Sequence, residues 1–235
     1  FGIGFAMVSS SVVALSIPTQ FESWMKPDVN VRVLLAALVI STITGLAFGL
    51  APALRLSRIA PARTFGWLVA DARPSLVKAI VAMEPSGPPV HDIVEKGAPS
   101  WFEDGPLAKP YGLTAPPLAY DPPVGNPAEL TFVRQDKPDA SDLVRCWAQA
   151  EPARTLVNLR NIPVLVVHAE ASYHAAYDHC TVAYLRQARV STVRFIRLSD
   201  VGIKGNGHML MLEKNNQEIA AIAERWLRES VETRK

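Results

Sequence analysis

Two ionisable side chains follow apolar runs and are of the types that transfer protons. Glu84 comes directly after the run 76–83, and His208 lies in a glycine-containing loop after the run 193–198. A carboxylate that orients a histidine, and a histidine that takes a proton from a nucleophile, are two members of a hydrolytic triad. We therefore take Glu84 and His208 as candidate catalytic residues. The alternatives are a solvent-facing or helix-capping carboxylate and a loop histidine bound by backbone groups.

The elements that must position these two residues alternate strand with helix. The residue pattern predicts helices over 64–73, 139–150 (with a possible extension to 159), 173–188 and 216–229, and strands over 76–83, 162–168 and 193–198. The first helix should end before Pro74, whose ring blocks continuation. This order predicts an α/β fold with a parallel sheet and flanking helices on both faces. Glu84 and His208 would then lie at the carboxyl ends of strands, where such sheets carry their chemistry.

Residues 85–138 form a proline-rich excursion between the first two predicted strands. The segment holds about two thirds of the chain's 19 prolines and several glycines, so we expect irregular structure. Long loops of this kind are often lids or binding loops. Trp101, Phe102 and Tyr111 are placed to cover an apolar substrate or, more simply, to pack.

The first quarter of the chain is different in character, because residues 1–17 and 33–54 contain no charged side chain. A 22-residue helix is about 33 Å long, which is enough to cross a hydrocarbon core of about 30 Å. The shorter stretch is at the lower limit and has a buried soluble helix as its alternative. Arginines follow the second stretch and favour a cytoplasmic end. We expect two hydrophobic, transmembrane-type helices, with a membrane as partner through residues 1–54.

The run Gly49-Leu-Ala-Pro-Ala-Leu-Arg55 and the apolar residues before it carry a resemblance. Residues 1–62 are similar to the terminal transmembrane segment of an FtsX/MacB-type ABC transporter permease. In that family the segment is a membrane helix without catalytic residues.

The rest of the chain carries a second resemblance, in the blocks Phe65–Pro74, Ile80–Pro88 and Gly205–Asn216. Residues from about 65 to 235 resemble the C-terminal part of a bacterial esterase family with the α/β-hydrolase fold. The resemblance implies a carboxylic-ester hydrolase of the Ser–Glu–His type, with His208 as general base and Glu84 as triad acid. It also implies a small-molecule ester as substrate, no cofactor and no metal. Relatives of this part are often secreted or periplasmic.

The nucleophile expected from that family is missing. The family pattern places a serine at position 60 in a sharp Gly-x-Ser-x-Gly turn, and this chain has Ala60 without flanking glycines. Ser57 lies nearby but still within the permease-like run. We therefore expect an incomplete α/β-hydrolase sheet that is inactive as given, divided into parts 1–62 and 63–235 that join near residues 60–64. The alternative is a membrane-anchored, non-catalytic fusion protein or an ABC permease fragment.

Composition removes two further classes of function. The chain is 49% hydrophobic and 20% charged, with a formal net charge of +2 over 235 residues. Such a chain is not intrinsically disordered, and it lacks the strongly basic surface of a dedicated nucleic-acid binder, so we expect no nucleic-acid partner.

The remaining candidates lie between residues 146 and 180. His168, His174, His179 and Asp178 invite a metal site, but a spacing of five does not put the last two histidines on one helix face, so we expect none. Tyr173 and His174 are placed to line a substrate pocket or to pack. Cys146 and Cys180 have no partner spacing, and we expect inert thiols.

Overall fold

The computed structural model describes residues 61–95 and 102–232, which belong to one compact unit, Ala60–Lys235. Its centre is a three-stranded parallel sheet in the order β1-β8-β9. The strands are β1 (Ile80–Met83), β8 (Val164–His168) and β9 (Val193–Arg197), and Val164 pairs with both Ile80 and Val193. The predicted parallel sheet is confirmed, although β1 is half as long as expected because a turn follows Pro74.

Strand β8 forms the middle of two separate cores. All five of its residues are buried. Since successive side chains point to opposite faces of a strand, Val164 and Val166 join one apolar cluster while Leu165 and Val167 join another. Both faces of the sheet are therefore covered, as a continuous apolar run predicts for a parallel strand.

Helices cover the two faces unequally. Helices α4 (Pro61–Ala72) and α5 (Asp178–Gln187) pack on the face of Val164 through residues such as Trp67 and Leu185. Helix α6 (Asn216–Glu232) packs on the other face through Ile219 and Trp226. All three were expected from the sequence. The predicted helix 173–188 is in fact two pieces, the 3-10 helix η4 (Tyr173–Ala176) followed by α5.

The excursion 85–138 contains regular structure, so the expectation of a wholly irregular segment is wrong. It contributes the antiparallel pair β2 (His91–Glu95) and β3 (Phe102–Leu107), strand β4 (Tyr120–Asp121), the 3-10 helix η3 (Pro127–Glu129) and strand β5 (Phe132–Arg134). Strand β6 (Trp147–Gln149) pairs with β5, and β7 (Thr155–Leu156) pairs with β4. The helix predicted over 139–150 is also wrong, because cross-strand pairing outweighs local helix preference there.

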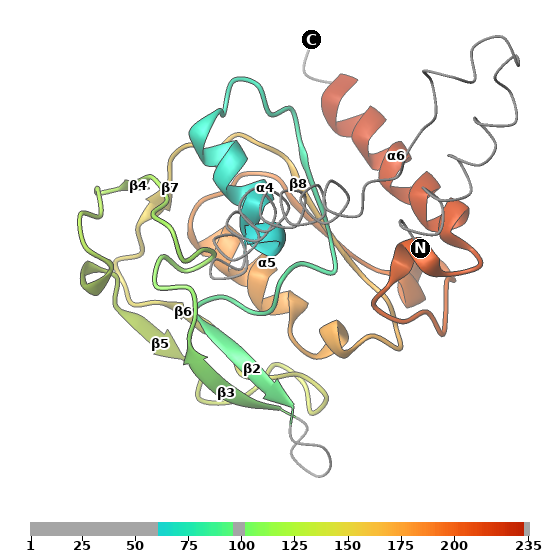
Figure 1. Cartoon of the computed structure of the whole chain (residues 1–235), viewed down its shortest axis with the longest axis horizontal. Helices are drawn as coiled ribbons and strands as arrows, with labels where there is room; N and C mark the ends of the chain where they lie inside the picture. Colours follow the sequence, from blue (N-terminus) through green and yellow to red (C-terminus); the bar gives the residue numbers. More distant parts are fainter. Residues whose placement is uncertain (1–60, 96–101, 233–235) are drawn as a thin grey trace, which may run out of the picture. The chain divides into compact units, whose positions relative to one another are not determined.

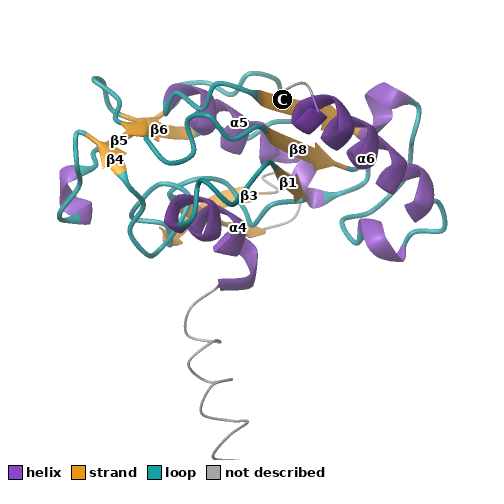
Figure 2. Ribbon diagram, turned by 90° about the horizontal axis from the view of Figure 1, so that it is seen from above, coloured by secondary structure: helices purple, strands orange, loops and turns teal. Residues whose placement is uncertain are grey.

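These small ribbons lie on the side of the molecule away from α6, as Figures 1 and 2 show from two directions. Two more 3-10 helices, η5 (Leu198–Val201) and η6 (Leu210–Leu212), flank the loop that carries His208.

A buried tyrosine pair fastens the excursion to α5. The hydroxyls of Tyr120 and Tyr184 are 2.9 Å apart, and the Tyr120 hydroxyl also donates to the carbonyl of Tyr111. Burial raises the pKa of both phenols, which therefore stay neutral. Gly112 has φ +80°, and a Cβ at this position would overlap the Tyr184 phenol. Tyr111 thus packs within the core rather than covering a substrate.

Candidate active site

Glu84 occupies the turn that ends β1. Its N–H donates to the carbonyl of Val167 at 2.8 Å, which extends the β1–β8 ladder by one residue. Its φ is +52°, in the left-handed region that residues other than glycine rarely adopt. Such a conformation costs on the order of 1–3 kcal/mol and tends to persist at functional sites. The surrounding structure must therefore hold the backbone of Glu84 in this unfavourable conformation.

Hydrogen bonds fix both oxygens of the Glu84 carboxylate. Oε1 accepts from the backbone N–H of Ala169 at 2.7 Å, and Oε2 accepts from the hydroxyl of Ser172. The Glu84 side chain is only 5% exposed. Ser172 also caps η4, because its hydroxyl oxygen accepts from the N–H of His174 at 3.1 Å. The carboxylate is thus tied to the loop after β8 and cannot turn freely. The solvent-facing alternative for Glu84 is wrong.

His174 and Asp178 complete a buried group with Glu84, here called the carboxylate cluster. His174 Nδ1 lies 3.1 Å from Asp178 Oδ1 and 3.8 Å from Glu84 Oε2. The side chains of Asp178 and His174 are 0% and 6% exposed. Burial, and secondarily the charge of Glu84, raise the pKa of Asp178 well above its usual value. The proton of the Asp178–His174 hydrogen bond can therefore lie on either residue.

His208 is exposed, and hydrogen bonds hold the two residues that precede it. Gly207 N–H donates to Glu213 Oε1 at 2.7 Å, and the carbonyl of the buried Asn206 accepts from Ala171 N–H at 3.0 Å. The second bond joins the His208 loop to the loop after β8, which carries Ser172. The His208 ring lies 4.8 Å from the ring of Tyr173, measured between centroids.

The structure brings the two predicted catalytic residues to one edge of the sheet but not into direct contact. No hydrogen bond joins Glu84 to His208 among the residues that the structure describes. Their common neighbour is His174, whose ring is nearly parallel to that of His208 at a centroid distance of 6.3 Å. Their catalytic roles therefore stay predictions.

Sequence reasoning missed the part that Ser172 and Asp178 play beside Glu84. Ser172 directly precedes the predicted helix at 173, and a serine there signals a helix cap. The position of Ser172 before that helix could therefore have been recognised from the sequence. The histidine and aspartate are spaced i, i+4, which is typical of a helical pair, although here they belong to two helices.

A second cluster consists of two cysteines and a histidine. Cys146 and Cys180 form a disulfide, which corrects the expectation of two inert thiols. His179 Nε2 lies 3.2 Å from the sulfur of Cys146 and 3.6 Å from that of Cys180. Desolvation lowers the pKa of His179 and favours the neutral ring. We call these three residues the sulfur cluster.

Each of the two clusters also contains side chains of the types that bind metal ions. Among the described residues, these are the two groups of three whose donor atoms all lie within 4.8 Å of one another. The disulfide removes two donors from the sulfur cluster, since thiolate is the ligand form of cysteine. Hydrogen bonding already accounts for the arrangement of the carboxylate cluster. His174 and His179 are divided between the two sets, so the four residues considered from the sequence do not form one site.

His168, the last residue of β8, is 3% exposed and packs edge-on against Phe195, with the ring centroids 5.1 Å apart. Desolvation lowers its pKa to about 4; a hydrogen bond with the backbone of His174 opposes this shift, and the charge of Arg197 adds to it. It is a neutral core histidine.

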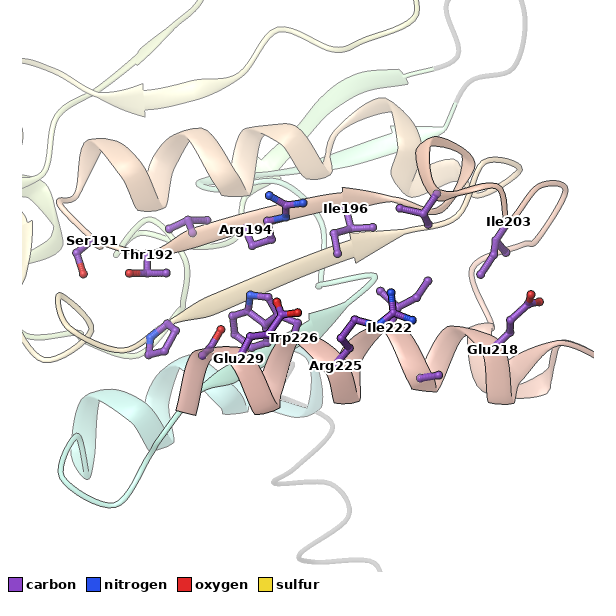
Figure 3. A pocket seen from close by; sticks show the side chains of 15 residues that line it. Ser191, Thr192, Arg194, Ile196, Ile203, Glu218, Ile222, Arg225, Trp226 and Glu229 are labelled. Atoms are coloured by element: carbon purple, nitrogen blue, oxygen red, sulfur yellow. The ribbon is translucent and has the colours of Figure 1, made fainter. Parts of the chain in front are cut away.

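An open groove of about 980 Å³ lies between β9 and α6 (Figure 3). Arg194 and Arg225 line it together with Glu218, Trp226 and Glu229. Glu84 and His208 do not line it, so the candidate site and this groove are separate surfaces.

Several sequence predictions fall outside the described residues. These are the two hydrophobic helices predicted over 1–17 and 33–54, the missing nucleophile at Ala60 with nearby Ser57, and Trp101. Within the described part, no helix combines the length and apolar character needed to cross a bilayer. The division of the chain near residues 60–64 stays a prediction.

Comparison with known proteins gives one informative relative. The chain is 44% identical over 181 residues to a probable secreted lipase, phiG, of a fungal species (strain ATCC 74256). The match covers 73% of this chain and 47% of the relative, so the chain spans about half of that protein's length. No protein-family profile matches the chain, and no solved structure matches it. The likeness supports the resemblance to ester hydrolases, and the comparisons give no support to the transporter-like resemblance or to a membrane partner.

Proposed function

We propose that residues 61–232 supply the acid and the base of a carboxylic-ester hydrolase, with Glu84 as triad acid and His208 as general base. The observation that carries the proposal is their position at one edge of the sheet, where both are neighbours of His174. The similarity to a probable secreted lipase supports the reaction class. A small-molecule ester is the substrate that this chemistry takes.

In the proposed reaction His208 accepts the proton of a serine hydroxyl while the serine oxygen attacks the acyl carbon of the ester. The alcohol then leaves with that proton, and water hydrolyses the acyl-enzyme by the same route. Glu84 fixes the tautomer of His208 and stabilises the imidazolium that forms. The fixed carboxylate of Glu84 and the tethered loop of His208 suit these roles.

We further propose that the 235-residue chain does not hydrolyse esters alone. The family pattern requires a serine where this sequence has Ala60. Loss of a nucleophile leaves only the residual rate that binding and oxyanion-stabilising groups supply.

The test compares the chain with a chimera in which the part of the fungal relative outside the match is joined to residues 61–235. With short p-nitrophenyl esters, the chain alone should be no faster than its His208→Ala variant. The chimera should hydrolyse the esters and lose this activity to a fluorophosphonate. His208→Ala in the chimera should reduce kcat by about 10³–10⁴-fold, and Glu84→Gln should also reduce it strongly.

Asp200→Asn provides a control, because Asp200 is exposed and pairs with Arg197 rather than with Glu84 or His208. It should leave the rate of the chimera unchanged. An active chimera that keeps its rate in the His208→Ala variant would refute the role of His208. Fluorophosphonate-sensitive hydrolysis by the chain alone would refute its inactivity.

A further inference from the structure

The carboxylate cluster places two carboxyl groups beside one imidazole nitrogen. His174 Nδ1 lies within 3.8 Å of an oxygen of Glu84 and 3.1 Å of an oxygen of Asp178. All three side chains are at most 6% exposed, so water screens them little. Two unscreened negative charges at this separation would repel each other strongly. The group therefore needs at least one proton.

We propose that His174 and Asp178 are positioning residues for Glu84, and that together they hold a single proton against its buried carboxylate. This inference rests on the proposed function, in which Glu84 is the acid that orients His208. The pair helps to fix the Glu84 carboxyl in place, while Ala169 and Ser172 hold its two oxygens.

Two arrangements of that proton have the same net charge of −1. In one, Asp178 is protonated and donates to a neutral His174. In the other, a protonated His174 lies between two carboxylates. Burial raises the pKa of Asp178, which favours the first arrangement. Asp178 Oδ2 is buried without a hydrogen-bond partner among the described residues, and a neutral carboxyl tolerates this better than a charged one.

The pair is well placed to respond to His208. The His174 and His208 rings are nearly parallel, 6.3 Å apart between centroids. A positive charge on His208 disfavours a second positive charge on His174, so the proton stays on Asp178 when His208 is charged. Glu84 then faces the imidazolium without competition from an ionised Asp178.

Other titratable groups among the described residues also face His174, from neighbouring elements and from η4 itself. They are Glu84 at the end of β1, Asp178 in α5, His168 in β8, His208 in its loop, and the ring neighbours Tyr173 and Tyr177. Of these, Glu84 and Asp178 are the acids within 4 Å of the His174 ring nitrogen.

The test uses the 235-residue chain, labelled with ¹³C and ¹⁵N, and needs no ester hydrolysis. The carboxyl carbon signal of Asp178 reports its protonation, and the ring nitrogen signals of His208 report which nitrogen carries the proton. Asp178 should stay protonated well above pH 3.9, the value for a carboxyl group in water. Glu84→Gln should shift this titration to lower pH, because the Glu84 charge helps to raise the pKa of Asp178.

The tautomer of His208 is the functional readout. Glu84→Gln should lower the preference for the Nδ1–H tautomer by about tenfold, because it removes the negative charge that Glu84 places at this edge of the sheet. His174→Leu should lower it by about threefold, as expected for weak coupling through a neighbour. In the Glu84→Gln background, His174→Leu should have no added effect, since its action passes through Glu84.

Asp178→Asn and Asp178→Leu form a matched pair. Asparagine can donate to His174 Nδ1 as a protonated aspartate does, so this variant should keep the His208 tautomer of the wild-type chain. Leucine cannot donate and should shift it. Backbone amide spectra of each variant establish that it folds, and His174→Gln replaces His174→Leu if the leucine variant does not.

The two proposals fail in different ways. If Glu84→Gln leaves the His208 tautomer unchanged, Glu84 does not act on His208 and the proposed function fails. If Glu84→Gln shifts the tautomer but the His174 and Asp178 variants do not, the positioning role alone is overturned. Ionisation of Asp178 near pH 3.9 would also overturn it.

Discussion

His174 and His179 are five positions apart, yet they lie in opposite chemical surroundings. The first belongs to the carboxylate cluster and faces Glu84 and Asp178. The second belongs to the sulfur cluster and faces the disulfide of Cys146 and Cys180. The break between η4 and α5 turns the two rings to different sides. The same residue type therefore serves two purposes: one cluster should respond to protons and the other to reductant.

Reduction of the disulfide should give the largest effect on stability. The bond spans 34 positions of sequence and joins the segment before β6 to α5. A loop of this length stabilises a fold by about 4 kcal/mol in the chain-entropy description. Urea unfolding with and without reductant should reveal this difference. The double variant Cys146→Ala/Cys180→Ala should be insensitive to reductant, and equal unfolding midpoints for the wild-type chain under both conditions would contradict the prediction.

Acid should act through His168, which lies near both clusters. Its pKa is about 4 in the folded chain and 6.5 in an ordinary setting. The His168 ring therefore binds a proton more tightly in the unfolded chain than in the folded chain. The stability it contributes is complete above pH 6.5 and is lost as the pH falls toward 4. The loss is about 2 kcal/mol after allowance for solvent screening.

The measurement is urea unfolding at several pH values between 7 and 4. His168→Gln should show a flatter dependence on pH than the wild-type chain. Parallel curves for the two proteins would show that His168 is not the group responsible.

Two His→Gln substitutions should have the smallest effect on stability. They test directly whether the surroundings of His174 and His179 differ in energy. His174→Gln should cost about 1.5 kcal/mol, because Asp178 is buried and depends on the His174 ring for a partner. His179→Gln should stay within about 0.5 kcal/mol, since sulfur is only a weak hydrogen-bond acceptor. Thermal and urea unfolding of the two variants check this. Equal costs would mean that the surroundings of the two rings do not differ in energy.

The sequence was most informative where apolar pattern and burial coincide. The fully buried strand β8 and helix α6 appear close to their predicted positions, because continuous and amphipathic apolar patterns allow few other structures. Glu84 directly follows β1, and His208 lies in the loop that follows β9 and η5. Their separation by His174 was not predictable, since it depends on how three loops meet.

The excursion was predicted least well. Strands β5 and β6 have three residues each, and their pairing joins segments whose local pattern favoured a loop and a helix. The disulfide was missed because two cysteines in a sequence do not indicate whether they meet. Both features arise from tertiary contacts that local propensity does not encode.

The contact between Gly112 and Tyr184 restricts how this protein can evolve. Any side chain at position 112 must occupy space that the phenol already fills, and the backbone there is left-handed. A larger residue at 112 becomes tolerable only when a smaller one replaces Tyr184, so neither position can drift alone. Homologues that retain this excursion should therefore show the two positions covarying.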